Sequence, residues 1–154
     1  MAIEIERKFL VTGDAWKRAT AGVLYRQGYL STDKARTVRV RIAGERAFMT
    51  VKGLAAGIAR PEFEYEIPLA DAATLLETLC LKPLIEKRRY TLACKGLCWE
   101  VDEFLGDNLG LVVAEVELDS VEQAIALPEW IGKEVTDDAR YFNSSLIAHP
   151  FCQW

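Results

Sequence analysis

Polar and apolar residues alternate with a period of two along much of the chain, a pattern typical of β-strands that have one covered face. Residues 3–9 read Ile-Glu-Ile-Glu-Arg-Lys-Phe, and similar alternation returns further along the chain. The later segments are residues 37–42, 49–52, 62–67, 84–92, 99–102 and 114–118. Because charged residues alternate with apolar ones, the pattern favours a largely antiparallel sheet over a parallel one.

Helices are predicted at three places between and after these strands. An apolar stripe over residues 75–80 predicts one helix, with Asp71 near its start as the cap. Ser120 and Gln123 form a capping box that predicts a short second helix. A last helix is expected over residues 136–148. With no internal repeat or linker, residues 1–154 are predicted to form a single α+β domain.

The overall charge limits the class of partner. Lysine and arginine number 19 and aspartate and glutamate 23, a formal net charge of −4. An acidic chain is a poor candidate for binding nucleic acid, which relies on a spread of basic surface residues. The chain shows neither a signal peptide nor an apolar run of the roughly 20 residues that span a bilayer, so we expect no membrane partner and a cytoplasmic location.

The cysteines do not predict a metal site. Cys80, Cys94, Cys98 and Cys152 include no CxxC pair, and His149 is the one histidine that could join them. Zinc sites need more closely spaced ligands. We therefore expect reduced thiols, and for His149 a place at the end of a helix.

Like-charged residues repeat two positions apart in six of the predicted strands. A half-solvated sheet face is an ordinary explanation for charge on any one strand, but such faces usually mix signs to avoid repulsion. Residues two apart on a strand are separated by about 7 Å, so paired carboxylates can converge on a hard cation and paired arginines on successive phosphates. The acidic sets are Glu4/Glu6, Glu62/Glu64/Glu66, Glu100/Asp102 and Glu115/Glu117, and the basic sets are Arg39/Arg41 and Lys87/Arg89.

These faces would point towards one another if the sheet closed into a barrel, with helices covering the apolar side. A barrel of about eight strands can hold one small ligand in its interior. Acidic and basic walls around one cavity are costly unless a polyanion and its cations fill it. The pattern therefore predicts a functional charged tunnel.

An ordered series of motifs resembles the CYTH superfamily of triphosphate tunnel metalloenzymes, closest to the bacterial inorganic tripolyphosphatases. It begins with Glu4-Ile5-Glu6-Arg7-Lys8, an ExExK signature, and the match covers nearly the whole chain. The later motifs are Gln27-Gly28-Tyr29-Leu30, Val38-Arg39-Val40-Arg41, Thr50-Val51-Lys52-Gly53, Glu62-Phe63-Glu64-Tyr65-Glu66-Ile67, Lys87-Arg88-Arg89-Tyr90, Glu100-Val101-Asp102, Ala114-Glu115-Val116-Glu117-Leu118, Gly132-Lys133-Glu134-Val135-Thr136 and Arg140-Tyr141-Asn143.

The resemblance implies an eight-stranded antiparallel closed β-barrel with helices packed on the outside, and it implies roles for single residues. The expected metal ligands are Glu4, Glu6, Asp102, Glu115 and Glu117. The expected phosphate ligands are Lys8, Arg39, Arg41, Lys52, Lys87, Arg89 and Arg140. Lys8, Tyr29, Glu4 and Glu117 are the expected catalytic residues, and Glu62 and Glu64 are further tunnel acids whose partners stay open.

The implied activity is hydrolysis of inorganic tripolyphosphate to pyrophosphate and phosphate, with Mg²⁺, two ions in number, or Mn²⁺ as cofactor. Attack by a metal-activated water is expected, with Glu4, Glu6 and Glu117 holding that metal. Oxygen-only ligands suit Mg²⁺. The alternatives are a class IV adenylate cyclase, a thiamine or nucleoside triphosphatase, and a non-catalytic module that binds polyphosphate or nucleotide. A homodimer is compatible with the sequence, which does not specify one.

Overall fold

Nine strands form one antiparallel sheet in the computed structural model, which describes residues 2–154. The strands are β1 (Ile3–Val11), β2 (Val23–Ser31), β3 (Thr37–Ala43), β4 (Arg46–Lys52), β5 (Ala59–Ile67), β6 (Ile85–Cys94), β7 (Leu97–Phe104), β8 (Val112–Glu117) and β9 (Ile131–Glu134). The α-helices are α1 (Ala15–Arg18), α2 (Leu69–Thr78) and α3 (Ser145–Ala148), and the 3₁₀ turns are η1 (Gly106–Asn108), η2 (Ala139–Tyr141) and η3 (Phe151–Gln153).

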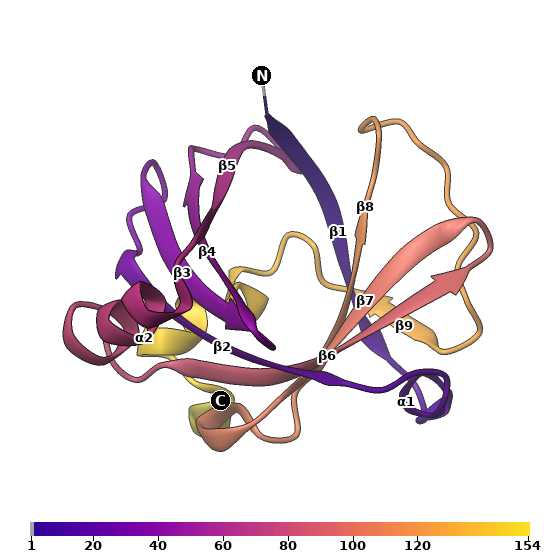
Figure 1. The fold of residues 1–154 in the computed structure, drawn as a ribbon. Helices are drawn as coiled ribbons and strands as arrows, with labels where there is room; N and C mark the ends of the chain where they lie inside the picture. Colours follow the sequence, from indigo (N-terminus) through magenta and orange to yellow (C-terminus); the bar gives the residue numbers. More distant parts are fainter. Residues whose placement is uncertain (1) are drawn as a thin grey trace.

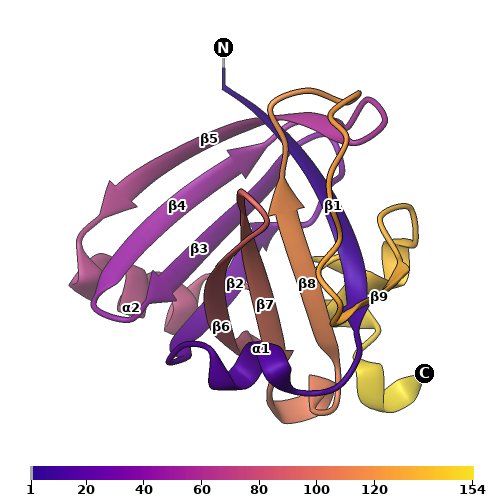
Figure 2. The same cartoon turned by 90° about the vertical axis from the view of Figure 1, so that its right-hand side faces the viewer.

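The first eight strands close into a barrel, as predicted (Figures 1 and 2). Neighbours run in the order β5-β4-β3-β2-β6-β7-β8-β1, and β1 returns to β5 through the pairs Ile3 with Pro61, Glu4 with Arg60 and Ile5 with Ala59. Strand β9 pairs with the far end of β1, at Phe9 and Val11. The wall between these two contacts of β1 is completed by the segment that follows β9, where the Val135 backbone N–H donates to the Lys8 carbonyl at 2.8 Å.

Short connections set the register of the hairpins. Between β6 and β7, Lys95 and Gly96 have φ values of 51° and 79°, a two-residue turn with both residues left-handed. Such turns match the twist of paired strands. They hold Arg89 opposite Asp102 across the β6–β7 ladder.

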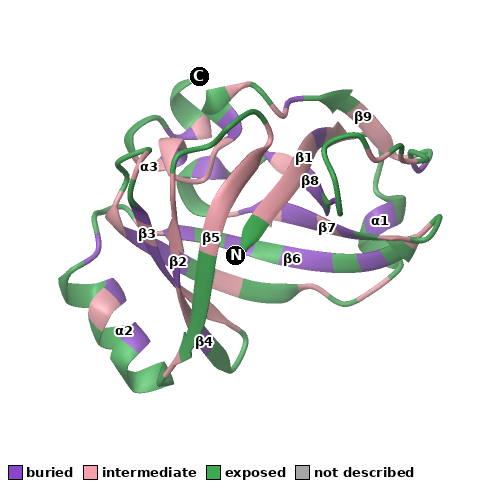
Figure 3. Ribbon diagram, turned by 90° about the horizontal axis from the view of Figure 1, so that it is seen from above, coloured by how far each residue is buried: buried purple, intermediate pink, exposed green. Residues whose placement is uncertain are grey.

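The apolar sides of the strands face outward and are covered by helices and loops. Along β6, for example, buried residues alternate with exposed ones (Figure 3). Ala72 and Leu76 of α2 pack on Val40 and Ala47 of β3 and β4. A second cluster gathers Phe9, Trp16, Trp99 and Val116 under α1, and a third packs Leu146 of α3 near Ile85 and Phe104. The inward side of the same strands is left to the charged residues.

Three details of the helix prediction are wrong. Helix α2 begins at Leu69 with Pro68 at its N-cap, so Asp71 lies in the first turn and caps nothing. The capping-box segment forms only turns: Gln123 Oε1 accepts a hydrogen bond from the Asp119 backbone N–H at 2.6 Å, but no helix follows. The predicted last helix is broken into η2 and α3, and His149 caps α3.

The four cysteines carry free thiols, as expected, although Cys98 and Cys152 are exposed rather than buried. Over residues 2–154, the helices are all too short or too polar to cross a bilayer.

Candidate functional site

The barrel encloses a cavity of about 390 Å³ to which all eight of its strands contribute side chains. Because alternate residues of a strand share a face, like-charged pairs such as Glu4/Glu6 and Arg39/Arg41 point into it together. Among the predicted residues, those lining the cavity are Glu4, Glu6, Lys8, Tyr29, Arg39, Arg41, Lys52, Glu62, Glu64, Lys87, Arg89, Glu115 and Glu117. Acidic and basic side chains line it in equal numbers.

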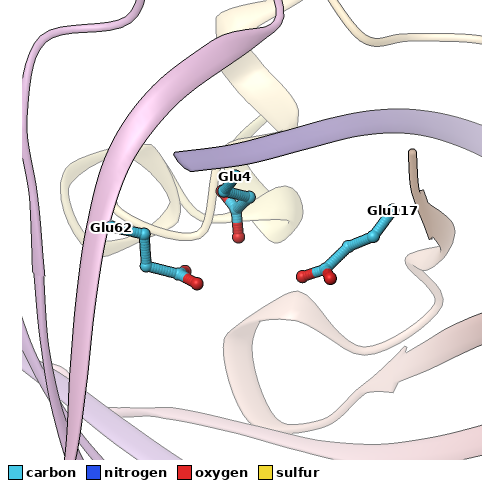
Figure 4. A group of neighbouring side chains, drawn as sticks. All are labelled: Glu4, Glu62 and Glu117. Carbon is cyan, nitrogen blue, oxygen red and sulfur yellow. The ribbon is translucent and has the colours of Figure 1, made fainter. Parts of the chain in front are cut away.

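One wall of the cavity holds a group of converging carboxylates (Figure 4). Oxygen atoms of Glu4 on β1, Glu62 on β5 and Glu117 on β8 lie within 4.8 Å of one another. Burial and the neighbouring Glu4 raise the pKa of Glu62 to about 7, and burial followed by Glu4 and Glu100 raises the pKa of Glu117. Burial opposes ionisation of Glu4 as well, but Lys52 at 2.8 Å lowers its pKa.

This donor set fits a hard divalent cation. Three carboxylates from three strands offer only oxygen, the ligand that Mg²⁺ prefers, and their mutual repulsion would be relieved by a cation between them. Glu6 lies next in line on β1, where burial and then Glu115 raise its pKa to about 8. Glu62, expected only as a tunnel acid, thus belongs to the carboxylate group.

Asp102 and Glu115, both predicted as metal ligands, have lysine and arginine side chains as their partners. Asp102 is fully buried and accepts hydrogen bonds from Lys87 Nζ at 2.7 Å and from Arg89 Nε and Nη2 at 2.7 and 2.8 Å. Burial disfavours its charge, but Arg89 and Lys87 hold its pKa at about 2. Glu115 accepts from Lys8 Nζ at 3.1 Å and lies 3.5 Å from Arg89. Asp102 does not line the cavity, so it acts as a counter-ion beneath it.

Arg41 of β3 is among the least neutralised cations of the cavity. Arg41 Nε donates to the amide oxygen of Gln27 at 2.8 Å, and no carboxylate of residues 2–154 makes an ion pair with Arg41. Burial, followed by Arg39 and Arg89, lowers the pKa of Arg41 to about 10. Arg39 donates to Thr50 at 3.1 Å and lies 3.6 Å from Glu64. A guanidinium held this way can bind an anion.

Lys8 and Tyr29, two of the four expected catalytic residues, both line the cavity but have different partners. Lys8 Nζ is 3.1 Å from Glu115 and 3.7 Å from Glu6; burial opposes its charge, but these two carboxylates raise its pKa. Tyr29 is only 4% exposed and lies opposite Arg39 in the β2–β3 ladder. Within residues 2–154, no hydrogen bond joins the two side chains.

One predicted cation lies outside the cavity and one unpredicted cation lies inside it. Arg140 pairs with Asp138 at 2.8 Å and stacks over the Trp154 ring at 5.0 Å, on the outer surface. Arg60 lines the cavity and donates to the Gly53 carbonyl at 2.9 Å. Its position two residues before Glu62 places it on the same face of β5, which is the signal that could have identified it.

Comparisons with known proteins agree with this architecture. The family model described as the CYTH domain matches residues 2–149. A curated protein of Acetivibrio thermocellus named inorganic triphosphatase is 54% identical over 151 residues, covering 98% of this chain and 97% of the relative. One of Nitrosomonas europaea with the same name is 37% identical over 147 residues, covering 93% and 95%. A solved crystal structure of an inorganic triphosphatase has a TM-score of 0.67 at 35% identity and covers 96% of this chain and 95% of its own. The chain is therefore a member of the CYTH domain family.

Proposed function

We propose that this protein is an Mg²⁺-dependent inorganic triphosphatase that hydrolyses tripolyphosphate to pyrophosphate and phosphate. The observation that carries the proposal is the presence, in one cavity, of a converging carboxylate group and a set of incompletely neutralised cations. The names of the two curated relatives, which match nearly the whole chain, support the same activity.

The basic side chains are placed to bind a linear chain of phosphates. Arg39 and Arg41 project side by side from β3. Lys52 approaches from β4 on one side of β3, and Lys87 from β6, beyond β2, on the other. Phosphoryl transfer depends mainly on holding the phosphates in line and stabilising charge on their oxygens. These cations would position the substrate, while the barrel wall limits access of bulk water to it.

The charge balance of the cavity favours a divalent cation as cofactor. Because acidic and basic side chains line the cavity in equal numbers, a polyphosphate alone would add uncompensated negative charge. Glu4, Glu62 and Glu117 would hold the ion, with Glu6 nearby. When bound, Mg²⁺ would supply charge stabilisation for phosphate oxygens and a more acidic water.

Lys8 is suited to orient the phosphates rather than to act as a base. Its two carboxylate neighbours favour the charged ammonium, which donates protons and accepts none. The Tyr29 hydroxyl lies on the same cavity wall as Arg39 and would add a neutral donor near the phosphates bound there.

The proposal is tested by product analysis with tripolyphosphate, ATP and thiamine triphosphate, each with Mg²⁺ and with EDTA. We expect fast phosphate release from tripolyphosphate that requires Mg²⁺, and slow release from the other two. Cyclic AMP formed from ATP would instead identify a cyclase. Binding of tripolyphosphate without turnover of any substrate would identify a binding module.

A further inference from the structure

Two neutral amide side chains join cations of β3 and β6, the strands on either side of β2. Gln27, on β2, is fully buried; its Oε1 accepts from Arg41 Nε at 2.8 Å and its Nε2 donates to Asn143 Oδ1 at 3.0 Å. The same Asn143 oxygen accepts from Lys87 Nζ at 2.9 Å. Asn143 comes from the segment between η2 and α3, so this amide pair also connects the C-terminal region to the barrel.

The chemistry of the partners sets the orientation of both amides. Arginine and lysine can only donate, so the oxygens of Gln27 and Asn143 must face Arg41 and Lys87. The Gln27 NH₂ group is then directed at the Asn143 oxygen, as observed. The Asn143 NH₂ group has no acceptor among residues 2–154, and Asn143 lines the cavity, so this group is available to an oxygen of a bound anion.

Most other cations of the cavity are held by charged partners; the exception is Arg60, which donates to the Gly53 carbonyl and to Thr37. Lys52 pairs with Glu4 at 2.8 Å and Lys8 with Glu115 at 3.1 Å, and each pair offsets positive charge. An amide oxygen fixes the position of a cation equally well but leaves its charge intact. Arg41, which also stacks over the Tyr25 ring at 5.0 Å, is held only in this neutral way.

We propose that Gln27 and Asn143 are positioning residues that hold Arg41 and Lys87 in place for the phosphate chain without neutralising them. This inference rests on the proposed function, since it assigns the anion that the two cations receive. Lys87 shares Asp102 with Arg89, so Lys87, Arg89 and Asp102 together carry one positive charge when Lys87 is protonated. Arg89 also lies 3.0 Å from Glu100 and 3.5 Å from Glu115. A carboxylate in either amide position would remove that charge or the charge of Arg41.

The test replaces each amide by its isosteric acid. Gln27→Glu keeps an oxygen acceptor for Arg41 and adds a negative charge, and Asn143→Asp does the same beside Lys87. Calorimetric titration with tripolyphosphate, run once in EDTA and once in a separate buffer with Ca²⁺, measures affinity without relying on turnover. We expect each variant to bind about tenfold or more weakly, because each pairs off one phosphate-binding charge.

A third variant tests whether Gln27 positions Arg41 while preserving its charge, or has a merely structural role. Gln27→Met has a similar volume, removes both hydrogen bonds and leaves the charge of Arg41 unchanged. The proposal predicts a smaller loss of affinity in Gln27→Met than in Gln27→Glu, whereas a structural role predicts the reverse order. If Gln27→Glu does not fold, the affinity of Asn143→Asp for tripolyphosphate, altered at a half-buried site, tests the proposal instead.

Matched controls carry the same chemical change outside the cavity. Gln123→Glu and Asn108→Asp keep their acceptor oxygens for backbone N–H groups and should bind tripolyphosphate like the unmodified protein. Unmodified affinity in a folded Gln27→Glu or Asn143→Asp variant overturns the inference, as does absence of tripolyphosphate binding by the unmodified protein. Binding without hydrolysis, weakened by both acids, would refute the triphosphatase and support the amide pair.

Discussion

Replacing Asp102 by asparagine separates two interpretations of this residue. As a metal ligand, Asp102 would matter only when Mg²⁺ is present. As the buried counter-ion seen here, it offsets the positive charge of Lys87 and Arg89 whether or not metal is bound. Asp102→Asn keeps the shape of the side chain and one acceptor oxygen, so the change tests the charge.

The expected loss of stability follows from the contacts of Asp102. Its three charge-assisted hydrogen bonds are 2.7–2.8 Å long, and the carboxylate is fully buried. Removing one member of a buried ion pair costs about 3–5 kcal/mol because it leaves an uncompensated charge. The lower end applies here, since Arg89 keeps Glu100 at 3.0 Å, and burial already lowers the pKa of Lys87 to about 7, so that Lys87 can lose its proton. For a chain of this size, about 3 kcal/mol lowers the melting temperature by roughly 6–12 °C.

The assay is thermal unfolding of both proteins in EDTA and in Mg²⁺, with Asp107→Asn at an exposed position as the control. We expect the same decrease in both buffers and none in the control. The pKa of Asp102 in the folded protein, about 2, lies below its ordinary value of 3.8. Its charge therefore stabilises the protein above pH 3.8, and the difference between the two proteins should shrink as pH falls towards 2. A decrease that occurs only with Mg²⁺ would refute the counter-ion interpretation.

Three further outcomes are expected. Glu117→Gln should lower turnover of tripolyphosphate by about 100-fold or more while leaving the melting temperature in EDTA unchanged, and near-normal turnover would contradict the metal assignment. Mg²⁺ affinity, measured by titration, should rise from about pH 6 to pH 9, because Glu62 and Glu6 must lose protons at about 7 and 8 before they bind metal; a constant affinity would speak against these carboxylates. Arg60→Gln should raise the KM for tripolyphosphate about tenfold, whereas Arg140→Gln, outside the cavity, should not. Equal effects on KM would show that lining the cavity does not determine which arginines bind the substrate.

Seven of the eight barrel strands could be predicted from alternation, and β2 could not. The inward residues of β2 are Tyr25, Gln27 and Tyr29, which carry no charge, so the strand lacks the contrast that marks its neighbours. It was indicated only by the motif around Gly28. There the outer face has room only for hydrogen, since an added Cβ would lie 2.7 Å from Leu84 and 2.8 Å from Cys80. Close packing of β2 against the α2–β6 connection, a tertiary contact, therefore requires glycine at position 28.

The helix predictions failed where local signals competed with packing. Gln123 accepts from the backbone N–H of Asp119 rather than from that of Ser120, the predicted N-cap, and the chain beyond it passes Pro128 and returns to pair with β1 as β9. The last predicted helix is interrupted because Phe142 and Asn143 are directed into the cavity, and a continuous helix could not place both there. Periodicity reports which face is apolar, but it does not report a segment that enters the barrel.

The sequence predicted which charged residues share the tunnel but not how they divide into groups. Alternation assigns Glu100 and Asp102 to one face in the same way as Glu115 and Glu117, although Asp102 is sealed under Arg89 while Glu117 faces the other carboxylates. The difference arises from depth along the barrel, which depends on the stagger between strands. A pattern read one strand at a time contains no information on stagger.

The stagger between strands also separates acidic and basic side chains along the axis of the cavity. Glu4 and Glu117 lie at the end of the barrel where β1 begins and β8 ends, and their carboxylates converge there with that of Glu62. Lys52 contacts Glu4 and Glu62 in this group, whereas Glu117 has no basic partner among residues 2–154. Arg41 lies further along β3, beside amides and an aromatic ring instead of acids. Had each acid been paired with a base, the cavity would be neutral at every point and would attract neither metal nor phosphate. Separation along the barrel axis leaves a negative region for a cation and a positive region for an anion, close enough for one substrate to contact both.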